Sequence, residues 1–157
     1  MRLTTKGRYA VTAMIDVALH ESSWPIRLAD IAVRQQITIA YLEQLASKLR
    51  QSGLLQSTRG PNGGYRLCRP AAEITLGEIL KSADEDIDVT RCGGSSNCQA
   101  GQRCLTHDLW AELNQEIWRL LESISLRDIC QKSNVRRIAA RQDAAFADLL
   151  KEQEVCE

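Results

Sequence analysis

Apolar residues recur at helical spacing through the first fifty positions of the chain. The segment from Thr4 to Leu19 has one apolar face, made of Tyr9, Ala10, Ala13, Met14, Val17 and Ala18, which predicts an amphipathic helix. A short helix is expected from Leu28 to Gln35. A third helix is expected to begin after Thr38, a good N-cap residue, and to end at Gly53.

Two short strands and a turn follow the third helix. Leu54–Ser57 and Tyr65–Leu67 have the character of strands, and the loop 59–64 between them is rich in glycine, which is typical of a β-hairpin. Helix, helix, turn, helix and hairpin is the element order of a winged helix. The pattern therefore predicts a mostly α fold, with a winged helix-turn-helix DNA-binding domain over residues 1–84.

The second half of the chain is expected to hold a loop between helices. A helix opened by Thr75 is expected to end near residue 84, and residues 85–105 form a loop rich in Gly, Ser, Asn and Cys. A long helix from Thr106 has a broad apolar stripe, made of Leu109, Trp110, Leu113, Ile117, Leu120, Leu121 and Ile124. Ser125 caps a short helix to Cys130. Residues 132–157 are expected to be a loosely ordered tail, either a loosely held helix or disorder.

The charges are divided unequally between the two halves of the chain. The chain has 157 residues with 20 basic and 20 acidic side chains, so its net charge does not indicate a nucleic-acid partner. Residues 1–80, however, contain ten Lys and Arg against six Asp and Glu, whereas residues 81–157 contain ten against fourteen. The first half therefore suits phosphate and the second does not.

The termini and the cysteines indicate where the protein works. No apolar run reaches the length of a membrane span, and the start of the chain lacks the apolar stretch of a signal peptide. We therefore expect a cytoplasmic protein with no membrane partner. Six cysteines in a reducing compartment favour metal ligation or redox chemistry over a disulfide framework.

The third helix and the wing carry the candidate DNA contacts. The first turns of that helix present Thr38, Ala40, Tyr41, Glu43 and Gln44. Glu43 could accept from a cytosine amino group and Gln44 could bond adenine. Arg59 and Gly60 suit the minor groove and the backbone beside it. Arg2, Lys6 and Lys48 are expected to contact phosphate.

Cys92, Cys98, Cys104 and His107 form a candidate metal site with the spacing C-x5-C-x5-C-x2-H. Structural zinc prefers cysteine pairs that are closer in sequence, so the longer gaps favour a larger object such as a [2Fe–2S] cluster. Free thiols that sense oxidants, with His107 as a capping or surface residue, are the alternative. The other three cysteines are interpreted as structural or incidental, and these are Cys68, Cys130 and Cys156.

Four blocks of sequence carry a family resemblance. They are the N-terminal MRLTTKGRYA, the run Tyr41–Leu45, the wing Arg59–Tyr65 and the stretch Cys104–His107. Together they closely resemble the IscR-type iron-sulfur cluster regulators, over about residues 1–130.

The resemblance implies a function, partners and ligands. It implies a homodimer through helices in residues 106–131, bound to two-fold symmetric promoter DNA. It implies a regulator, mainly a repressor and not an enzyme, that senses cluster supply and controls cluster-assembly genes, with the assembly machinery as cluster donor. A [2Fe–2S] cofactor would be held by the residues at 92, 98, 104 and 107, and base contacts would come from Glu43 and Arg59.

Two residues depart from the family pattern. The family usually has a hydroxyl residue at Ala40 and often glycine at Gln36, so one base contact is missing and a turn is slightly strained.

Three rival functions remain. A nitric-oxide or redox-sensing regulator of the same family is the nearest rival. Against it, His107 offers a local fourth ligand, and Arg8 is a poor substitute for a carboxylate ligand from the first helix. A small electron-transfer protein would leave the wing unexplained. A zinc-stabilised DNA-binding module is the third rival.

Overall fold

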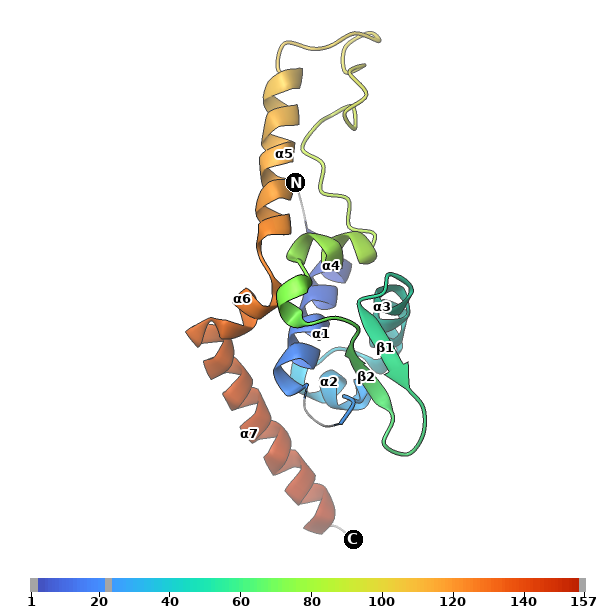
Figure 1. Cartoon of the computed structure of the whole chain (residues 1–157), viewed down its shortest axis with the longest axis vertical. Coiled ribbons are helices and arrows are strands. Elements are labelled where there is room, and N and C mark those ends of the chain that lie inside the picture. The colour runs from blue at the N-terminus through green and yellow to red at the C-terminus, as the bar shows by residue number, and fades with distance from the viewer. Residues whose placement is uncertain (1–2, 22–23, 156–157) are drawn as a thin grey trace.

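The computed structural model describes residues 3–21 and 24–155, and in these it is mostly helical with one two-stranded sheet. The elements are α1 (Thr5–His20), α2 (Leu28–Gln35), α3 (Ile39–Gln51), β1 (Leu55–Thr58), β2 (Gly64–Leu67), the 3₁₀ turn η1 (Ala71–Glu73), α4 (Leu76–Ser82), α5 (His107–Ser123), α6 (Leu126–Gln131) and α7 (Ser133–Val155). Elements α1 to α4 form a winged helix-turn-helix head, and α5 projects away from it (Figure 1). The expected fold class is confirmed.

One apolar core holds the head together. Met14 of α1, Ile31 of α2, Leu42 of α3 and Ile79 of α4 are fully buried in it. Leu126 of α6 enters the same core. Burying a side chain of this size contributes about 1.5–3 kcal/mol. The residues that recur at helical spacing in α1 and α3 are the ones that supply this core, so periodicity predicted the right faces.

The turn between α2 and α3 has the left-handed backbone that was expected at Gln36. Its φ and ψ are 54° and 43°, and its N–H donates to the carbonyl of Ala32. For a residue other than glycine, this conformation costs about 1 kcal/mol. Ile37 follows directly and is buried in the core, which offsets that cost and fixes the direction in which α3 leaves the turn.

The wing is a hairpin that is anchored along one edge. β1 and β2 pair antiparallel from Leu55 opposite Leu67 to Thr58 opposite Gly64. On the other edge of β2, the N–H of Ile26 donates to the carbonyl of Tyr65 at 2.9 Å, and the reverse bond is 2.8 Å. A Cβ at Gly64 would lie 2.5 Å from the carbonyl oxygen of Ile26, so this close approach requires glycine.

Capping boxes set the starts of the two short helices. The Thr75 hydroxyl accepts from the N–H of Glu78 at α4, and the Ser125 hydroxyl accepts from the N–H of Asp128 at α6. Each cap residue also pairs with the other through an isolated antiparallel bridge. The bridge attaches the start of α6 to the head, directly after the end of α5.

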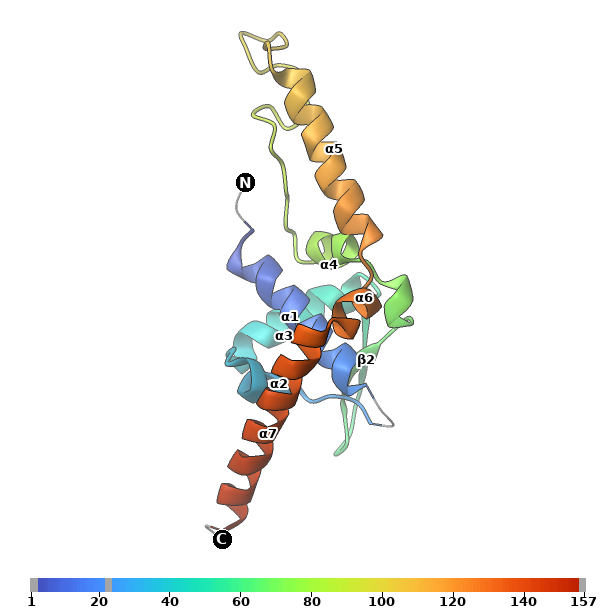
Figure 2. The same cartoon turned by 90° about the vertical axis from the view of Figure 1, so that its left-hand side faces the viewer.

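Helix α5 keeps an apolar stripe that the described part of its own chain leaves exposed. Leu109 is 58% exposed, Leu120 is 61% exposed, and Trp110 and Leu113 are also exposed. Figures 1 and 2 both show α5 extending beyond the head, accompanied by the loop that precedes it. No described helix combines the length and the hydropathy of a segment that crosses a bilayer.

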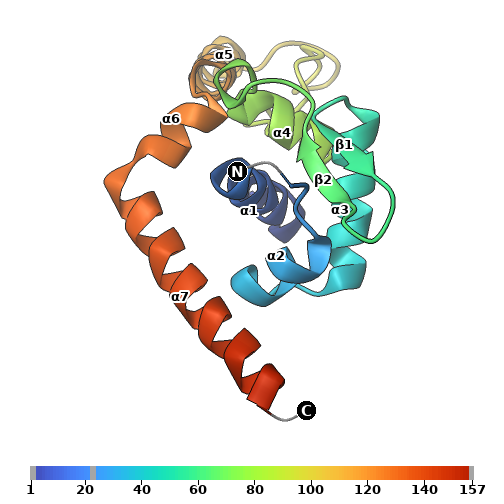
Figure 3. The same ribbon diagram turned by 60° about the horizontal axis from the view of Figure 1, so that its bottom comes forward.

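The chain from residue 133, for which a loosely held helix or disorder was expected, is helical and packs against the head. Ser133–Val155 is one continuous helix that runs along α1 and α2 (Figure 3). Gln142 and Gln35 exchange two side-chain hydrogen bonds of 3.0 and 3.1 Å. The Arg34 guanidinium lies 5.3 Å from the ring centre of Phe146. These contacts join residues more than a hundred positions apart, so local composition could not reveal them.

A buried carboxylate organises the polar contacts between α1, α2 and α7. Asp16 is 1% exposed and accepts two hydrogen bonds from Arg34, at 2.6 and 3.1 Å, and one from Gln35 at 2.7 Å. Burial raises the pKa of Asp16, but the bonds with His20, Arg34 and Gln35 outweigh it and lower the pKa to about 2. His20 lies between Asp16 and Asp143 of α7, with its Nε2 2.8 Å from the Asp143 carboxylate.

Raising the pH is expected to weaken this junction. The hydrogen bond to Asp16, helped by Asp143 and opposed by burial, raises the pKa of His20 from 6.5 to about 9. Protonated His20 therefore stabilises the fold fully below pH 6.5, and the contribution is lost as the pH rises through 9. Unfolding temperatures of the wild type and of His20→Gln test this, since only the wild type should lose this increment between pH 6.5 and 9. Parallel pH profiles of the two proteins would contradict it.

Candidate metal centre and nucleic-acid interface

The loop from residue 85 to residue 106 brings the cysteines back to the start of α5. Gly93, Gly94 and Gly101 have positive φ angles that let the loop reverse direction. The N–H of Ser95 donates to the carbonyl of Cys92, and the N–H of His107 donates to the carbonyl of Cys104. His107 is the first residue of α5 and is 5% exposed, so its ring points into the loop.

Three of the four predicted ligands converge. Nδ1 of His107 lies 3.4 Å from Sγ of Cys92 and 3.6 Å from Sγ of Cys98. These three donor atoms all lie within 4.8 Å of one another. A buried imidazole facing two thiols is a soft donor set of the kind that binds zinc, iron or an iron-sulfur cluster.

The fourth predicted ligand, Cys104, lies beside this group. Its backbone N–H donates to Sγ of Cys98 at 3.1 Å, and its own Sγ lies 3.7 Å from the Thr106 hydroxyl. Cys104 lines the same pocket, of about 310 Å³, together with the other three ligands and with Thr90, Arg91, Thr106 and Trp110. The structure thus places all four predicted ligands around one cavity and brings three of them into a single donor cluster.

The thiols of the group differ in how readily they lose a proton. Burial raises the pKa of Cys92, but backbone N–H groups of Ser96 and Gly94 outweigh it, so the pKa is lowered. A hydrogen bond from the Cys98 thiol lowers the pKa of Cys104. The N–H of Cys104 lowers the pKa of Cys98, but the neighbouring thiols and burial raise it more. The loop therefore lowers the pKa of Cys92 and Cys104 and raises that of Cys98.

Ser96 supports the site and was not predicted from the sequence. Its hydroxyl oxygen lies 3.2 Å from Nε2 of His107 and accepts from Nε of Arg103 at 3.3 Å. A contact at the far ring nitrogen of this kind orients a histidine ligand. Ser96 has a φ angle of 59°, a local conformation that no sequence pattern here indicated. Arg103 also pairs with Asp108 at 3.0 Å, so its charge is shared.

The predicted base-reading residues lie on the exposed side of α3. Thr38, Ala40, Glu43 and Gln44 are exposed, and Tyr41 is half-buried with its ring edge against Tyr9. Thr38 occupies the N-cap position but its side chain makes no capping bond within the described chain. Its hydroxyl is therefore not committed to the helix.

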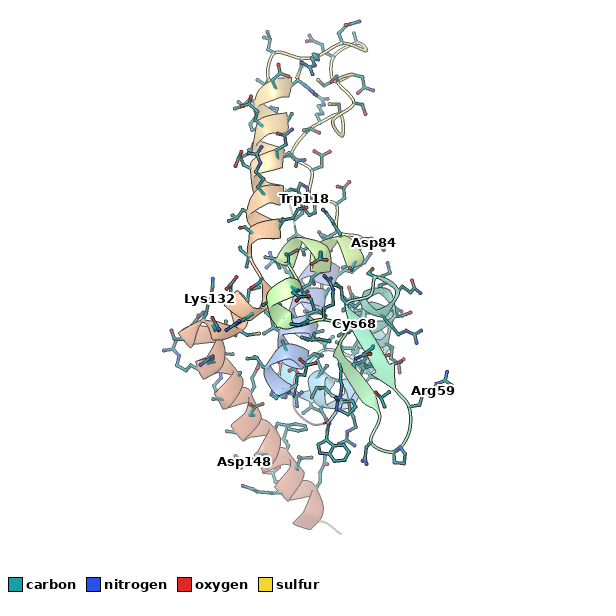
Figure 4. The ribbon with its side chains drawn as sticks, in the orientation of Figure 1. Arg59, Cys68, Asp84, Trp118, Lys132 and Asp148 are labelled. Atoms are coloured by element: carbon teal, nitrogen blue, oxygen red, sulfur yellow. The ribbon has the colours of Figure 1, made fainter. Side chains whose placement is uncertain are left out.

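The predicted phosphate and minor-groove residues lie on three separate elements. Arg59 and Gly60 are exposed in the wing loop, where Figure 4 shows Arg59 pointing away from the body of the head. Lys6 of α1 and Lys48 of α3 both pair with the carboxylate of Asp84, a residue that the sequence had not singled out. Arg2 lies outside the described residues.

The remaining cysteines lie apart from the site. Cys68 is exposed directly after β2, and Cys130 is half-buried in α6, where burial raises the pKa of its thiol. Cys156 lies outside the described residues. Among the described residues, the cysteines that could hold a metal together are therefore those of the loop 92–107.

The chain is similar to a family of transcription regulators over most of its length. The model of the Rrf2 family, described as an iron-dependent transcriptional regulator, matches residues 3–132. The HTH-type transcriptional regulator IscR of Photorhabdus laumondii is 54% identical over 143 residues, which are 91% of this chain and 87% of that protein. The IscR of Vibrio cholerae is 50% identical over 147 residues, which are 94% of this chain and 85% of that protein.

Solved structures show the same likeness. CymR, the global cysteine regulator of B. subtilis, has a TM-score of 0.72 at 32% identity, and the match covers 83% of this chain and 96% of that one. IscR of T. potens has a TM-score of 0.67 at 34% identity, covering 82% and 85%. Since the family model and these relatives span most of the chain, it belongs to the Rrf2 family and is a winged-helix transcription regulator that binds DNA, not an enzyme.

Proposed function

We propose that this regulator senses the supply of iron-sulfur clusters and mainly represses cluster-assembly genes. In this proposal a [2Fe–2S] cluster is held by Cys92, Cys98, Cys104 and His107. The observation that carries it is the convergence of two thiols on Nδ1 of a buried histidine at the first turn of α5. The name IscR of the relatives and the iron dependence of the family support it.

The donor set fits a cluster that is readily lost. When bound, a cluster with one imidazole among its ligands supplies a redox-active inorganic core of raised potential. His107 contributes a neutral imidazole ligand that is weaker than a thiolate. Ser96 holds the far side of the ring, and Arg91 lines the cavity as a nearby cation. The protein thus offers three strong ligands and one weak one.

The rival functions would use the same site with a different ligand or a different response. Zinc also binds thiolate and imidazole, and its usual structural sites have cysteines two to four residues apart, whereas five residues separate each pair here. Nitric-oxide or redox sensing would use the same three cysteines with a different response. Iron and sulfide content decides between zinc and a cluster.

A homodimer through α5 is part of the proposal. Leu109, Leu113 and Leu120 share one exposed face of α5, and a second α5 packed against it would remove these side chains from water. Two heads related by a two-fold axis would then read a two-fold symmetric promoter site. The cluster would come from the assembly machinery in the cytoplasm.

Purification without oxygen tests the cofactor. The protein is expected to contain about two iron atoms and two sulfide ions per chain and to show broad visible charge-transfer bands. His107→Cys should retain the iron longer in air than the wild type, because a thiolate replaces the weaker ligand. A colourless protein containing zinc, or equal retention in the two proteins, would contradict the cluster or the histidine ligand respectively.

A pair of cysteine variants locates the ligands. Cys98→Ser is expected to lose most of its bound iron, because its Sγ belongs to the donor cluster. Cys68→Ser is the matched control, since Cys68 is exposed and outside the site, and it should keep the wild-type iron content. Equal iron loss in both variants would mean that the cysteine loop is not the site.

Changes in the wing and in α3 should have different effects on DNA binding. Arg59→Ala is expected to reduce affinity and to lower the slope of log Kd against log salt by about 0.9, because a minor-groove arginine also neutralises about one charge of the adjacent phosphates. Glu43→Ala should instead relax base preference with little change in that slope. Gel-shift titrations at several salt concentrations measure both. An unchanged slope in Arg59→Ala would exclude a phosphate contact at the wing.

A further inference from the structure

One carboxylate holds two of the lysines that were expected to contact phosphate. Nζ of Lys6 lies 3.1 Å from Oδ2 of Asp84, and Nζ of Lys48 is paired with the same oxygen. Lys6 comes from the first turn of α1 and Lys48 from the last turns of α3, so Asp84 joins two separate elements of the head. Asp84 itself is exposed at the end of α4, close to α3 (Figure 4).

The position of Asp84 is fixed by its neighbours. It has a left-handed φ of 52°, and its N–H donates to the carbonyl of Lys81 at 3.0 Å. The next residue, Glu85, is 5% exposed and accepts from the backbone N–H of Thr4 at 2.8 Å as well as from its hydroxyl. A Cβ at Gly7 would lie 2.6 Å from the Glu85 carboxylate, so α1 packs directly on this segment.

The same segment leads without interruption to the cysteine loop. The carbonyl of Ile87 accepts from the Trp118 indole at 3.0 Å, and the N–H of Val89 donates to Asn114 at 3.2 Å. Thr90 then bonds Asp88 and, through its hydroxyl, accepts from the N–H of Gly94 at 3.0 Å. We call residues 84–92 the strap. Asp84 is at one end of the strap and Cys92 is at the other.

The charges around Asp84 determine the net charge that a DNA phosphate would meet at this surface. Two ammonium groups and one carboxylate leave a single net positive charge where two lysines alone would present two. A phosphate therefore competes with the Asp84 carboxylate for both lysines. Exposed ion pairs are weak enough for phosphate to compete with them, and the competition lowers affinity without preventing binding.

We propose that Asp84 restrains Lys6 and Lys48 and thereby sets the strength of the phosphate contacts, with the strap linking this restraint to the cysteine loop. Asp84 is a positioning residue in this account, because it acts on DNA through the two lysines. The link to the cysteine loop rests on the proposed function, whereas the restraint of the lysines by Asp84 does not.

Asp84→Asn tests the restraint with little risk to the fold, because asparagine also tolerates a left-handed backbone. Binding to a fluorescent duplex of mixed sequence, about 30 base pairs long, is measured by anisotropy. Asp84→Asn should bind about threefold to tenfold more tightly than the wild type. Asp148→Asn is the matched control, because Asp148 is also paired with a lysine, Lys151, but lies on α7. It should change affinity less than twofold.

The double variant Lys6→Ala, Lys48→Ala shows whether the lysines transmit the effect. It should lower the salt slope by about 1.8, or 0.9 for each phosphate contact, and adding Asp84→Asn to it should leave affinity unchanged. Weaker binding by Asp84→Asn in the wild-type background would mean that Asp84 aligns the lysines for DNA, which overturns the proposal. Equal tightening without the lysines, or an unchanged salt slope, would also overturn it.

Comparison of iron-loaded and iron-stripped protein tests the link through the strap. The ratio of their affinities for the duplex should move toward one in Asp84→Asn. A ratio that differs from one in the wild type and is unchanged in Asp84→Asn would refute the link. A wild-type ratio of one would refute it as well, while the tightening caused by Asp84→Asn would still be measurable. Failure of the cluster proposal itself is detected separately, by the iron and sulfide content.

Discussion

The buried ring of His107 is the point on which the rest of the structure depends. It belongs at once to the first turn of α5 and to the cysteine loop, with two thiols on one side and Ser96 on the other. Because the ring is almost fully buried, a change in what the thiols hold cannot be absorbed by free rotation of the side chain. It must be accommodated by the loop or by the start of α5, and these are the segments that lead to the exposed apolar face of α5 and to the head.

The separation of charge along the chain has a structural counterpart. The basic surplus lies in the DNA-binding head and the acidic surplus begins with Asp84 and Glu85, directly after it. Folding brings these acidic residues back against α1 and α3, where they pair with Lys6 and Lys48 or accept from Thr4. The zero net charge thus conceals a basic head and an acidic remainder, two residues of which fold back onto the head. Affinity for phosphate depends on how these residues are arranged.

Local sequence signals predicted the elements, and long-range contacts decided what the elements do. Helical periodicity identified the buried faces of α1 and α3, and Thr75 and Ser125 marked two helix starts because capping is a local interaction. The cysteine spacing indicated four candidate ligands, and the folded loop shows that three of them converge while Cys104 lies beside them. The pairing of Asp84 with two lysines and the packing of α7 join residues distant in sequence. A single sequence contains no local pattern that indicates such long-range contacts.

The network around Asp16 explains why a signal should act between segments and not within the head. Asp16 is 1% exposed and its partner Arg34 has a side chain that is 6% exposed. Separating such a pair leaves a buried charge without a partner, at a cost of about 3–5 kcal/mol. The pair fixes α1 against α2, and His20 and Gln142 extend the same network to α7. By contrast, the ion pairs of Asp84 are exposed and inexpensive to break. The head can therefore keep one internal arrangement while its contacts with the strap, and through them the positions of Lys6 and Lys48, change.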